Sequence, residues 1–121
     1  MKTVLIVEDK TIIALDLKFM IKKWGLDNSV ICGSGKKAID YIDTYSPNLA
    51  ILDIKLADEI SGIEVAEKLR ERNIPFIFLS AFSDPNNLKL AEELNPFAIL
   101  KKPLFTEQIS HTIEKFLEVE N

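Results

Sequence analysis

Short apolar runs alternate along this chain with segments in which apolar residues recur every three or four positions. The runs are too short for ordinary helices and are bounded by polar, glycine or proline residues, which is typical of strands buried on both faces. The recurring segments are typical of helices that bury one side. The pattern predicts strands at about 3–7, 29–33, 48–53, 75–79 and 97–100, and helices at about 13–24, 36–45, 61–72, 85–94 and 106–118.

This regular alternation predicts parallel strands joined by right-handed crossovers. We therefore expect one α/β domain over residues 1–121, built as a single doubly wound five-stranded parallel sheet flanked by five helices. The common strand order for such a flavodoxin-like fold is 2-1-3-4-5. In that order the first, third, fourth and fifth strands are neighbours, and their ends meet at one edge of the sheet.

Residues at the helix ends support these boundaries. Gly25 is well placed to cap the first helix, and Ser61 and Glu64 have the spacing of a capping box. Asp84, followed by a proline, is typical of a helix start. The stretch 33–36, Gly-Ser-Gly-Lys, lacks the spacing of a nucleotide-binding phosphate loop, so we interpret it as the start of the second helix.

Polar side chains stand at corresponding ends of the predicted strands. Glu8 and Asp9 follow the first strand, Asp53 ends the third, Ser80 ends the fourth and Lys102 comes at the end of the fifth. A carboxylate inside a strand covered on both faces would be costly, so Asp53 is expected where its strand emerges from the sheet. Ligands of open α/β sheets bind at that edge. Asp53 alone could simply begin a loop, and Glu8-Asp9 alone could cap a helix, but the whole set predicts a site.

Composition narrows the class of protein. The chain has 121 residues, of which 47% are hydrophobic and 28% charged, as in ordinary globular domains. Its net charge of −4 and pI near 5.0 predict no direct binding to nucleic acid or to an anionic membrane. No apolar run reaches membrane-spanning length, and Glu8-Asp9 ends the first one too early for a signal peptide. The single cysteine, Cys32, is interpreted as a core residue, which suits a reducing cytoplasm.

Four short motifs carry a family resemblance. Val4-Leu-Ile-Val-Glu-Asp9, Leu52-Asp53, Ser80-Ala81 and Lys102-Pro103 occur in order and at suitable spacing over essentially the whole chain. Each motif is weak alone, but together they resemble the receiver domains of two-component response regulators. The resemblance implies a phosphorylation-dependent signalling switch and not an enzyme of metabolism, with only weak self-phosphorylation from acyl phosphates and weak autodephosphorylation.

The acidic residues of these motifs suit a hard cation. Three carboxylates close together repel one another unless a cation joins them, and oxygen ligands favour ions such as Mg²⁺. The resemblance implies that Asp9 and Asp53 ligate Mg²⁺ directly. It also implies that the backbone carbonyl of Lys55 adds a ligand and that Glu8 reaches the ion through water.

The resemblance also implies the phosphoryl chemistry. Asp53 is the expected phosphoacceptor, which attacks a phosphoryl group carried by a kinase histidine or by a small acyl phosphate. Lys102 would neutralise charge on the transferred group, and Ser80 would hydrogen-bond one of its oxygens and draw its loop inward. Ser80 and Ile99 hold the switch positions. The implied partners are a sensor histidine kinase and a downstream protein target or output domain in the cytoplasm, and a homodimer linked to phosphorylation is compatible with both.

Several positions depart from the family pattern. Ile99 stands three positions before Lys102, where an aromatic switch residue is usual, so coupling through a rotating ring is left open. Ala57 replaces a frequent proline, and Leu104 stands where phenylalanine is common. The loop from 53 to 62 is acidic and one residue longer than in many members. None of these departures touches the expected nucleophile or metal ligands.

Other functions can be weighed against the same residues. A haloacid-dehalogenase-type phosphatase also uses an aspartate nucleophile with Mg²⁺, but its DxD motif follows the first strand, where this chain has Glu8-Asp9-Lys10. A flavodoxin needs a Ser/Thr/Gly-rich phosphate loop there, and the two acids would repel a flavin phosphate. A receiver-like interaction module that works without phosphorylation stays open. Lys101 is interpreted as solvated, and His111 as a surface or boundary residue.

The ends of the chain bear on its output. Met1 favours a native N-terminus, whereas no output domain fits after the last predicted helix. We therefore expect either a single-domain regulator that acts by protein contact or one domain of a longer protein.

Overall fold

The computed structural model describes residues 2–81 and 85–120. All the strands and helices expected from the sequence are present, and their ends lie within two residues of the expected ones. In chain order they are β1 (Thr3–Val7), α1 (Thr11–Lys22), β2 (Asn28–Cys32), α2 (Gly35–Thr44), β3 (Leu49–Asp53), α3 (Gly62–Glu71), β4 (Phe76–Ser80), α4 (Pro85–Glu93), β5 (Ala98–Lys101) and α5 (Thr106–Glu120).

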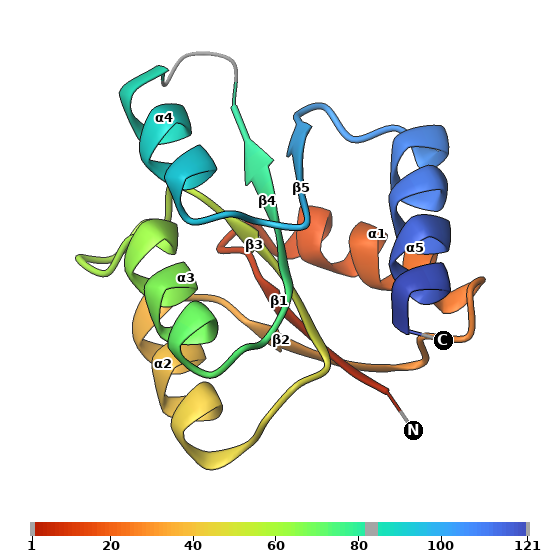
Figure 1. The fold of residues 1–121 in the computed structure, drawn as a ribbon, viewed down its shortest axis with the longest axis horizontal. Coiled ribbons are helices and arrows are strands. Elements are labelled where there is room, and N and C mark those ends of the chain that lie inside the picture. The colour runs from red at the N-terminus through yellow and green to blue at the C-terminus, as the bar shows by residue number, and fades with distance from the viewer. Residues whose placement is uncertain (1, 82–84, 121) are drawn as a thin grey trace.

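The strands form one parallel sheet in the order β2-β1-β3-β4-β5, which confirms the predicted doubly wound topology. Figure 1 shows α1 and α5 on one face of the sheet and α2, α3 and α4 on the other. From β1 the chain moves outward to β2, returns past β1 to β3, and then proceeds to β4 and β5. The direction of winding thus changes between β1 and β3, and open α/β sheets bind ligands at the carboxyl ends of strands beside such a change.

Two apolar cores hold the central strands from both faces. Side chains alternate along β3 and β4, so Leu52 and Phe78 join the core under α2, α3 and α4, whereas Ile51 and Ile77 join the core under α1 and α5. All four side chains are at most 1% exposed. Burial of each stabilises the fold by about 1.5–3 kcal/mol. The polar residues at the ends of β3 and β4 therefore stand on strands that packing holds in place.

The helix-end signals in the sequence are confirmed in the described residues. Gly25 has a φ of 81° shortly after α1, the left-handed conformation that ends many helices. Ser34 caps α2 and Ser61 caps α3, because each hydroxyl accepts a hydrogen bond from the backbone amide three residues later. The stretch 33–36 is therefore a helix start, as predicted. Asp84, the expected cap of α4, lies outside the described residues.

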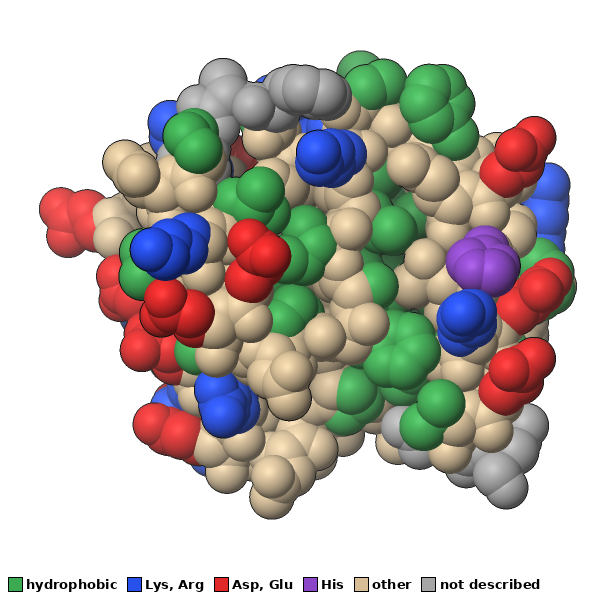
Figure 2. Space-filling view, turned by 45° about the horizontal axis from the view of Figure 1, so that its top comes forward, with side chains coloured by type: hydrophobic (Ala, Val, Ile, Leu, Met, Phe, Trp, Pro, Cys, Tyr) green, Lys and Arg blue, Asp and Glu red, His purple; other side chains and the backbone are tan. Residues whose placement is uncertain are grey.

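Three residues that were not assigned to the site from the sequence have the burial expected of them. Cys32 is buried in the core, and Lys101 and His111 are exposed. None of the helices in the described part of the chain is long and apolar enough to cross a membrane. Figure 2 shows acidic side chains at both the left and the right of the view, with lysine and arginine side chains among them. This face therefore carries mixed charge.

Candidate functional site

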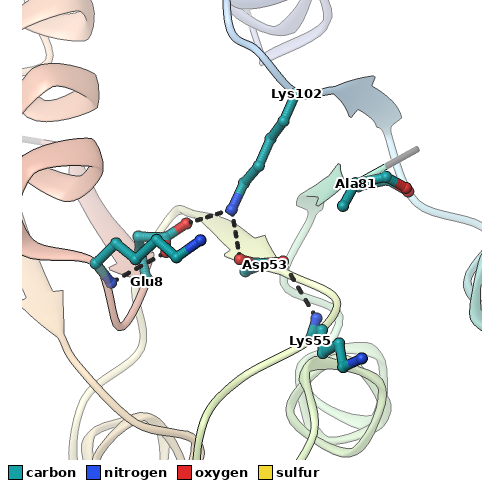
Figure 3. A network of polar contacts seen from close by, with 7 residues as sticks. Glu8, Asp53, Lys55, Ala81 and Lys102 are labelled. Atoms are coloured by element: carbon teal, nitrogen blue, oxygen red, sulfur yellow. Dashed lines mark hydrogen bonds and ion pairs between the residues drawn. The ribbon is translucent and has the colours of Figure 1, made fainter. Parts of the chain in front are cut away.

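The polar residues at the strand ends come together at one edge of the sheet. Glu8 directly follows β1, Asp53 is the last residue of β3, Ser80 is the last residue of β4, and Lys102 directly follows β5. Because β1, β3, β4 and β5 are neighbours in a parallel sheet, their carboxyl ends share this edge. Figure 3 shows the side chains of Glu8 and Lys102 pointing toward Asp53. The convergence expected from the sequence is therefore present.

Lys102 joins the two buried carboxylates. Its Nζ lies 2.6 Å from Asp53 Oδ2 and 3.1 Å from Glu8 Oε2, as the dashed lines in Figure 3 mark. The Glu8 side chain is fully buried, and those of Asp53 and Lys102 are 9% and 18% exposed. The Lys102 backbone amide also donates a hydrogen bond to the Ser80 carbonyl at 2.8 Å, which ties the residue to the end of β4. One ammonium thus balances part of the charge of two carboxylates.

Backbone amides occupy the other oxygen of each carboxylate. Asp53 Oδ1 accepts a hydrogen bond from the amide of Lys55 at 3.1 Å, and Glu8 Oε1 accepts one from the amide of Lys10 at 3.1 Å. Each acid is therefore held by a loop amide on one side and by Lys102 on the other. Charge-assisted hydrogen bonds of this kind orient carboxylates firmly. Both side chains keep a defined orientation at the edge of the sheet.

Burial and the neighbouring charges shift the pKa values of the site. Burial raises the pKa of Glu8 above its ordinary value, and the nearby Asp53 charge adds to this, whereas the Lys10 amide and Lys102 oppose it. For Lys102, burial lowers the pKa, but the hydrogen bond and charge of Asp53 together with those of Glu8 outweigh it and leave the pKa raised. The site therefore carries an excess of negative charge that one lysine only partly balances.

The raised pKa of Glu8 predicts that its charge destabilises the metal-free protein. The ordinary pKa of glutamate is 4.5, and the pKa of Glu8 is raised in the folded protein. The contribution of Glu8 to the free energy of unfolding is therefore complete below about pH 4.5 and is lost as the pH rises through the folded-state pKa. Glu8→Gln is expected to increase the free energy of unfolding at neutral pH, and this gain should fade below about pH 4. Urea titrations with a chelator present would measure it. Glu59→Gln, at an exposed glutamate, is the control, and a neutral-pH loss of stability in Glu8→Gln would contradict the prediction.

A group of oxygen donors at this edge fits a divalent cation. Glu8, Asp9 and Asp53 each offer a carboxylate oxygen, and the three atoms lie within 4.8 Å of one another. Carboxylate oxygens at this separation are the ligands that hard cations such as Mg²⁺ prefer. Asp9 is half-buried, and with Asp53, Lys55 and Lys102 it lines a surface pocket of about 310 Å³. The donor set and the open pocket beside it are compatible with a metal ion that solvent can reach.

Ser80 and Ile99 lie around this group and not inside it. Ser80 is buried at 3% exposure, and its hydroxyl donates a hydrogen bond to the Ala81 carbonyl at 3.2 Å. Ile99 is half-buried in β5 opposite Phe78, and it packs against the core under α2, α3 and α4. Lys55 is held by the hydrogen bond from its amide to Asp53, and its side chain is exposed.

Two residues that support the site were not singled out in the sequence. Gly62 begins α3, and a Cβ built on it would lie 1.9 Å from the Asp53 carbonyl oxygen, so only glycine allows this approach. Asp58, noted only as part of an acidic loop, accepts hydrogen bonds from the first amides of α2. For Gly62, the only sequence signal is a weak one, its place directly after the capping serine. For Asp58 there is no local signal, because its hydrogen-bond partners lie far away along the chain.

Comparison with known proteins agrees with this geometry. Residues 4–114 match the family described as the response regulator receiver domain. The transcriptional regulatory protein PdtaR of Mycobacterium tuberculosis is 30% identical over 114 residues, which are 93% of this chain and 55% of that protein. The response regulator protein GraR of Staphylococcus aureus is 30% identical over 104 residues, which are 85% of this chain and 46% of that protein. The chain thus spans about half the length of the curated relatives it matches.

Solved structures resemble the whole fold. The signal receiver domain of a modulated diguanylate cyclase from Desulfovibrio desulfuricans has a TM-score of 0.83 and 30% identity, and the match covers 93% of this chain and 90% of that one. A response regulator receiver domain protein from Clostridium thermocellum has a TM-score of 0.84 at 20% identity, over 99% and 97% of the two chains. This second likeness bears on the fold alone.

Proposed function

The chain belongs to the family of response regulator receiver domains, and on that premise we propose that it is a phosphorylation-dependent switch in which Asp53 accepts a phosphoryl group. The observation that carries the proposal is the position of the Asp53 carboxylate. It lines a pocket and contacts Lys102, with the carboxylates of Glu8 and Asp9 beside it. The arrangement supports the proposal, because phosphoryl transfer depends on positioning of the nucleophile and on neutralisation of charge.

In the proposed transfer, an Asp53 carboxylate oxygen attacks the phosphorus of a phosphohistidine or an acyl phosphate. The new O–P bond forms as the bond from phosphorus to the leaving nitrogen or acyl oxygen breaks, and the leaving group keeps that electron pair. Lys102 Nζ contacts Asp53 Oδ2, so its ammonium would lie close enough to balance charge on the transferred group. The Lys55 amide on Oδ1 keeps the carboxylate from rotating away.

Mg²⁺ is the proposed cofactor. Asp9 and Asp53 would hold it directly, with the Lys55 backbone carbonyl as a further ligand and Glu8 acting through water. The carboxylate group supports this, since its three oxygens lie within one small volume. When bound, Mg²⁺ would supply positive charge to the phosphoryl oxygens, which the single ammonium of Lys102 supplies only in part.

The proposed response to phosphorylation begins at Ser80. Its hydroxyl would leave the Ala81 carbonyl and donate to a phosphoryl oxygen, and the end of β4 would shift with it. Ile99 lies in β5 next to β4 and packs against the core, so this displacement would reach it through packing and without the rotation of an aromatic ring. The switch would then shift a population between inactive and active surfaces.

We infer partners of the kind that the family implies. A sensor histidine kinase would donate the phosphoryl group in the cytoplasm, and a downstream protein or output domain would read the phosphorylated surface. Among the relatives, PdtaR is named a transcriptional regulator, but the chain spans only about half of it, so direct DNA contact is not proposed for these residues. A homodimer that forms on phosphorylation is compatible with this scheme.

Incubation with acetyl phosphate and Mg²⁺ tests the proposal. We expect intact-protein mass spectrometry to detect one added phosphoryl group, and we expect the product to disappear slowly after the donor is removed. The same incubation with a chelator in place of Mg²⁺ should give little product. Wild-type protein that gains no mass under these conditions would favour the alternative, a receiver-like interaction module that works without phosphorylation.

A further inference from the structure

The loop between β3 and α3 connects the proposed phosphoacceptor to α2. Residues 54–61 follow Asp53, and Lys55, Leu56 and Ala57 of this loop line the pocket beside it. The proposed scheme takes one metal ligand, the Lys55 carbonyl, from the same loop. Whatever holds this loop therefore also holds one wall of the site.

Asp58 attaches the loop to the start of α2. Its Oδ1 accepts a hydrogen bond from the Gly35 amide at 3.0 Å, and its Oδ2 accepts one from the Lys36 amide at 3.1 Å. The first amides of a helix have no partners within the helix, so a carboxylate that takes two of them is well bound there. These hydrogen bonds join residues 23 and 22 positions apart. Asp58 is thus an N-terminal cap supplied from a different segment of the chain.

Close packing keeps the loop and α2 together. Gly35 is buried, and a Cβ built on it would lie 2.4 Å from the Ile60 carbonyl oxygen, so the backbone of the loop lies directly on the first turn of α2. Leu56 is 8% exposed and anchors the middle of the loop in the core. Backbone hydrogen bonds of Ile54 and the amide of Lys55 hold the beginning of the loop. Beyond them, Leu56 and the Ile60 contact hold it by packing, and Asp58 holds it by side-chain hydrogen bonds.

The charge of Asp58 strengthens this attachment. The hydrogen bond from the Gly35 amide holds the pKa of the Asp58 carboxyl below its usual range, and the Lys36 amide adds to the effect. The carboxylate is therefore ionised throughout the neutral range. An ionised acid at a helix N-terminus also gains from the helix dipole.

We propose that Asp58 is a positioning residue of the site, which fixes the loop that carries Lys55 by clamping it to the N-terminus of α2. The inference rests on the proposed function, because it concerns the metal ligand and the pocket wall of that site. Asp58 lies outside the proposed carboxylate ligands and the pocket lining, and it acts through the backbone between residues 55 and 58. Loss of the clamp should weaken Mg²⁺ binding and loosen the amide that orients Asp53.

The test compares two caps of the same helix. Asp58→Ala removes the clamp, whereas Ser34→Ala removes the cap on the Lys37 amide and leaves the loop attached. Both variants should lose stability, since either change removes a helix cap. Only Asp58→Ala should raise the Mg²⁺ dissociation constant, by about tenfold in calorimetry, as supporting residues of metal sites do. Asp58→Asn keeps one acceptor oxygen and should lie between wild type and Asp58→Ala.

A second readout does not depend on metal. In metal-free protein, hydrogen exchange at the Lys55 amide should be faster in Asp58→Ala than in wild type and unchanged in Ser34→Ala. Two results would overturn the inference and leave Asp58 as a structural cap only. One is a Mg²⁺ dissociation constant of Asp58→Ala equal to that of wild type, and the other is an equal hydrogen-exchange rate at the Lys55 amide in Asp58→Ala and Ser34→Ala. If wild type itself binds no Mg²⁺, the proposed function fails, and the inference fails with it.

Discussion

Replacing Asp53 with asparagine is expected to abolish phosphoryl incorporation from acetyl phosphate. The neutral amide has no anionic oxygen to attack phosphorus, and it is also a poorer ligand for a hard cation. The shape of the side chain is conserved, and one oxygen remains to accept the hydrogen bond from the Lys55 amide or from Lys102. The variant should therefore fold and lose essentially all of the incorporated phosphoryl group, as measured by intact-protein mass spectrometry.

Asp27→Asn is the matched control for this variant. Asp27 is exposed in the connection between α1 and β2, away from the carboxyl edge of the sheet, and its replacement should leave incorporation unchanged. Circular dichroism would confirm that both variants are folded. Incorporation that persists undiminished in Asp53→Asn would move the phosphoacceptor to another residue. A loss in both variants would point to a general effect of the mutations.

Replacing Gly62 with alanine is expected to cost about 3 kcal/mol or more of unfolding free energy. A Cβ at this position would lie 1.9 Å from the Asp53 carbonyl oxygen and 2.8 Å from the Ile54 backbone. Backbone atoms of a central strand cannot move aside as the end of a flexible side chain can. The cost is a large part of the total stability of an ordinary domain, which is about 5–15 kcal/mol. Urea or thermal denaturation would measure it.

Gly33→Ala is the control, because a Cβ there meets nothing within 4 Å. Its effect should stay within about 0.5 kcal/mol, as is usual for surface changes. The clash at Gly62 also falls on the residue proposed to be phosphorylated. Where Gly62→Ala protein folds at low temperature, it should therefore incorporate phosphoryl groups more slowly than wild type. A Gly62→Ala protein as stable as Gly33→Ala would show that β3 and α3 separate easily.

Much of the fold follows from local pattern. Each strand is a short apolar run and each helix buries a recurring face, and such signals are complete within a few residues. Where the ends differ, they differ by a turn or less: α1 begins at Thr11, and α5 continues to Glu120. The strand order agrees with the one that is common in doubly wound sheets, since regular alternation of strands and helices leaves few parallel arrangements.

The convergence of polar side chains at the carboxyl edge of the sheet was predictable for a similar reason. Glu8, Asp53 and Lys102 each end or directly follow a strand of the sheet, and parallel strands bring such ends to one edge. The contacts among them were not predictable. Lys102 contacts both acids, and the Ser80 hydroxyl donates to the neighbouring Ala81 carbonyl. These contacts depend on side-chain orientations that packing selects.

Periodicity and strand-end chemistry thus establish the doubly wound sheet and the acids, hydroxyl and lysine at its edge, since these features depend on neighbours along the chain. The tertiary structure alone established the Asp58 clamp on α2 and the close approach of Gly62 to Asp53. The clamp joins segments more than twenty positions apart, and the glycine contact depends on the angle at which α3 meets β3. Neither the distance between segments nor that angle is encoded in any short stretch of residues.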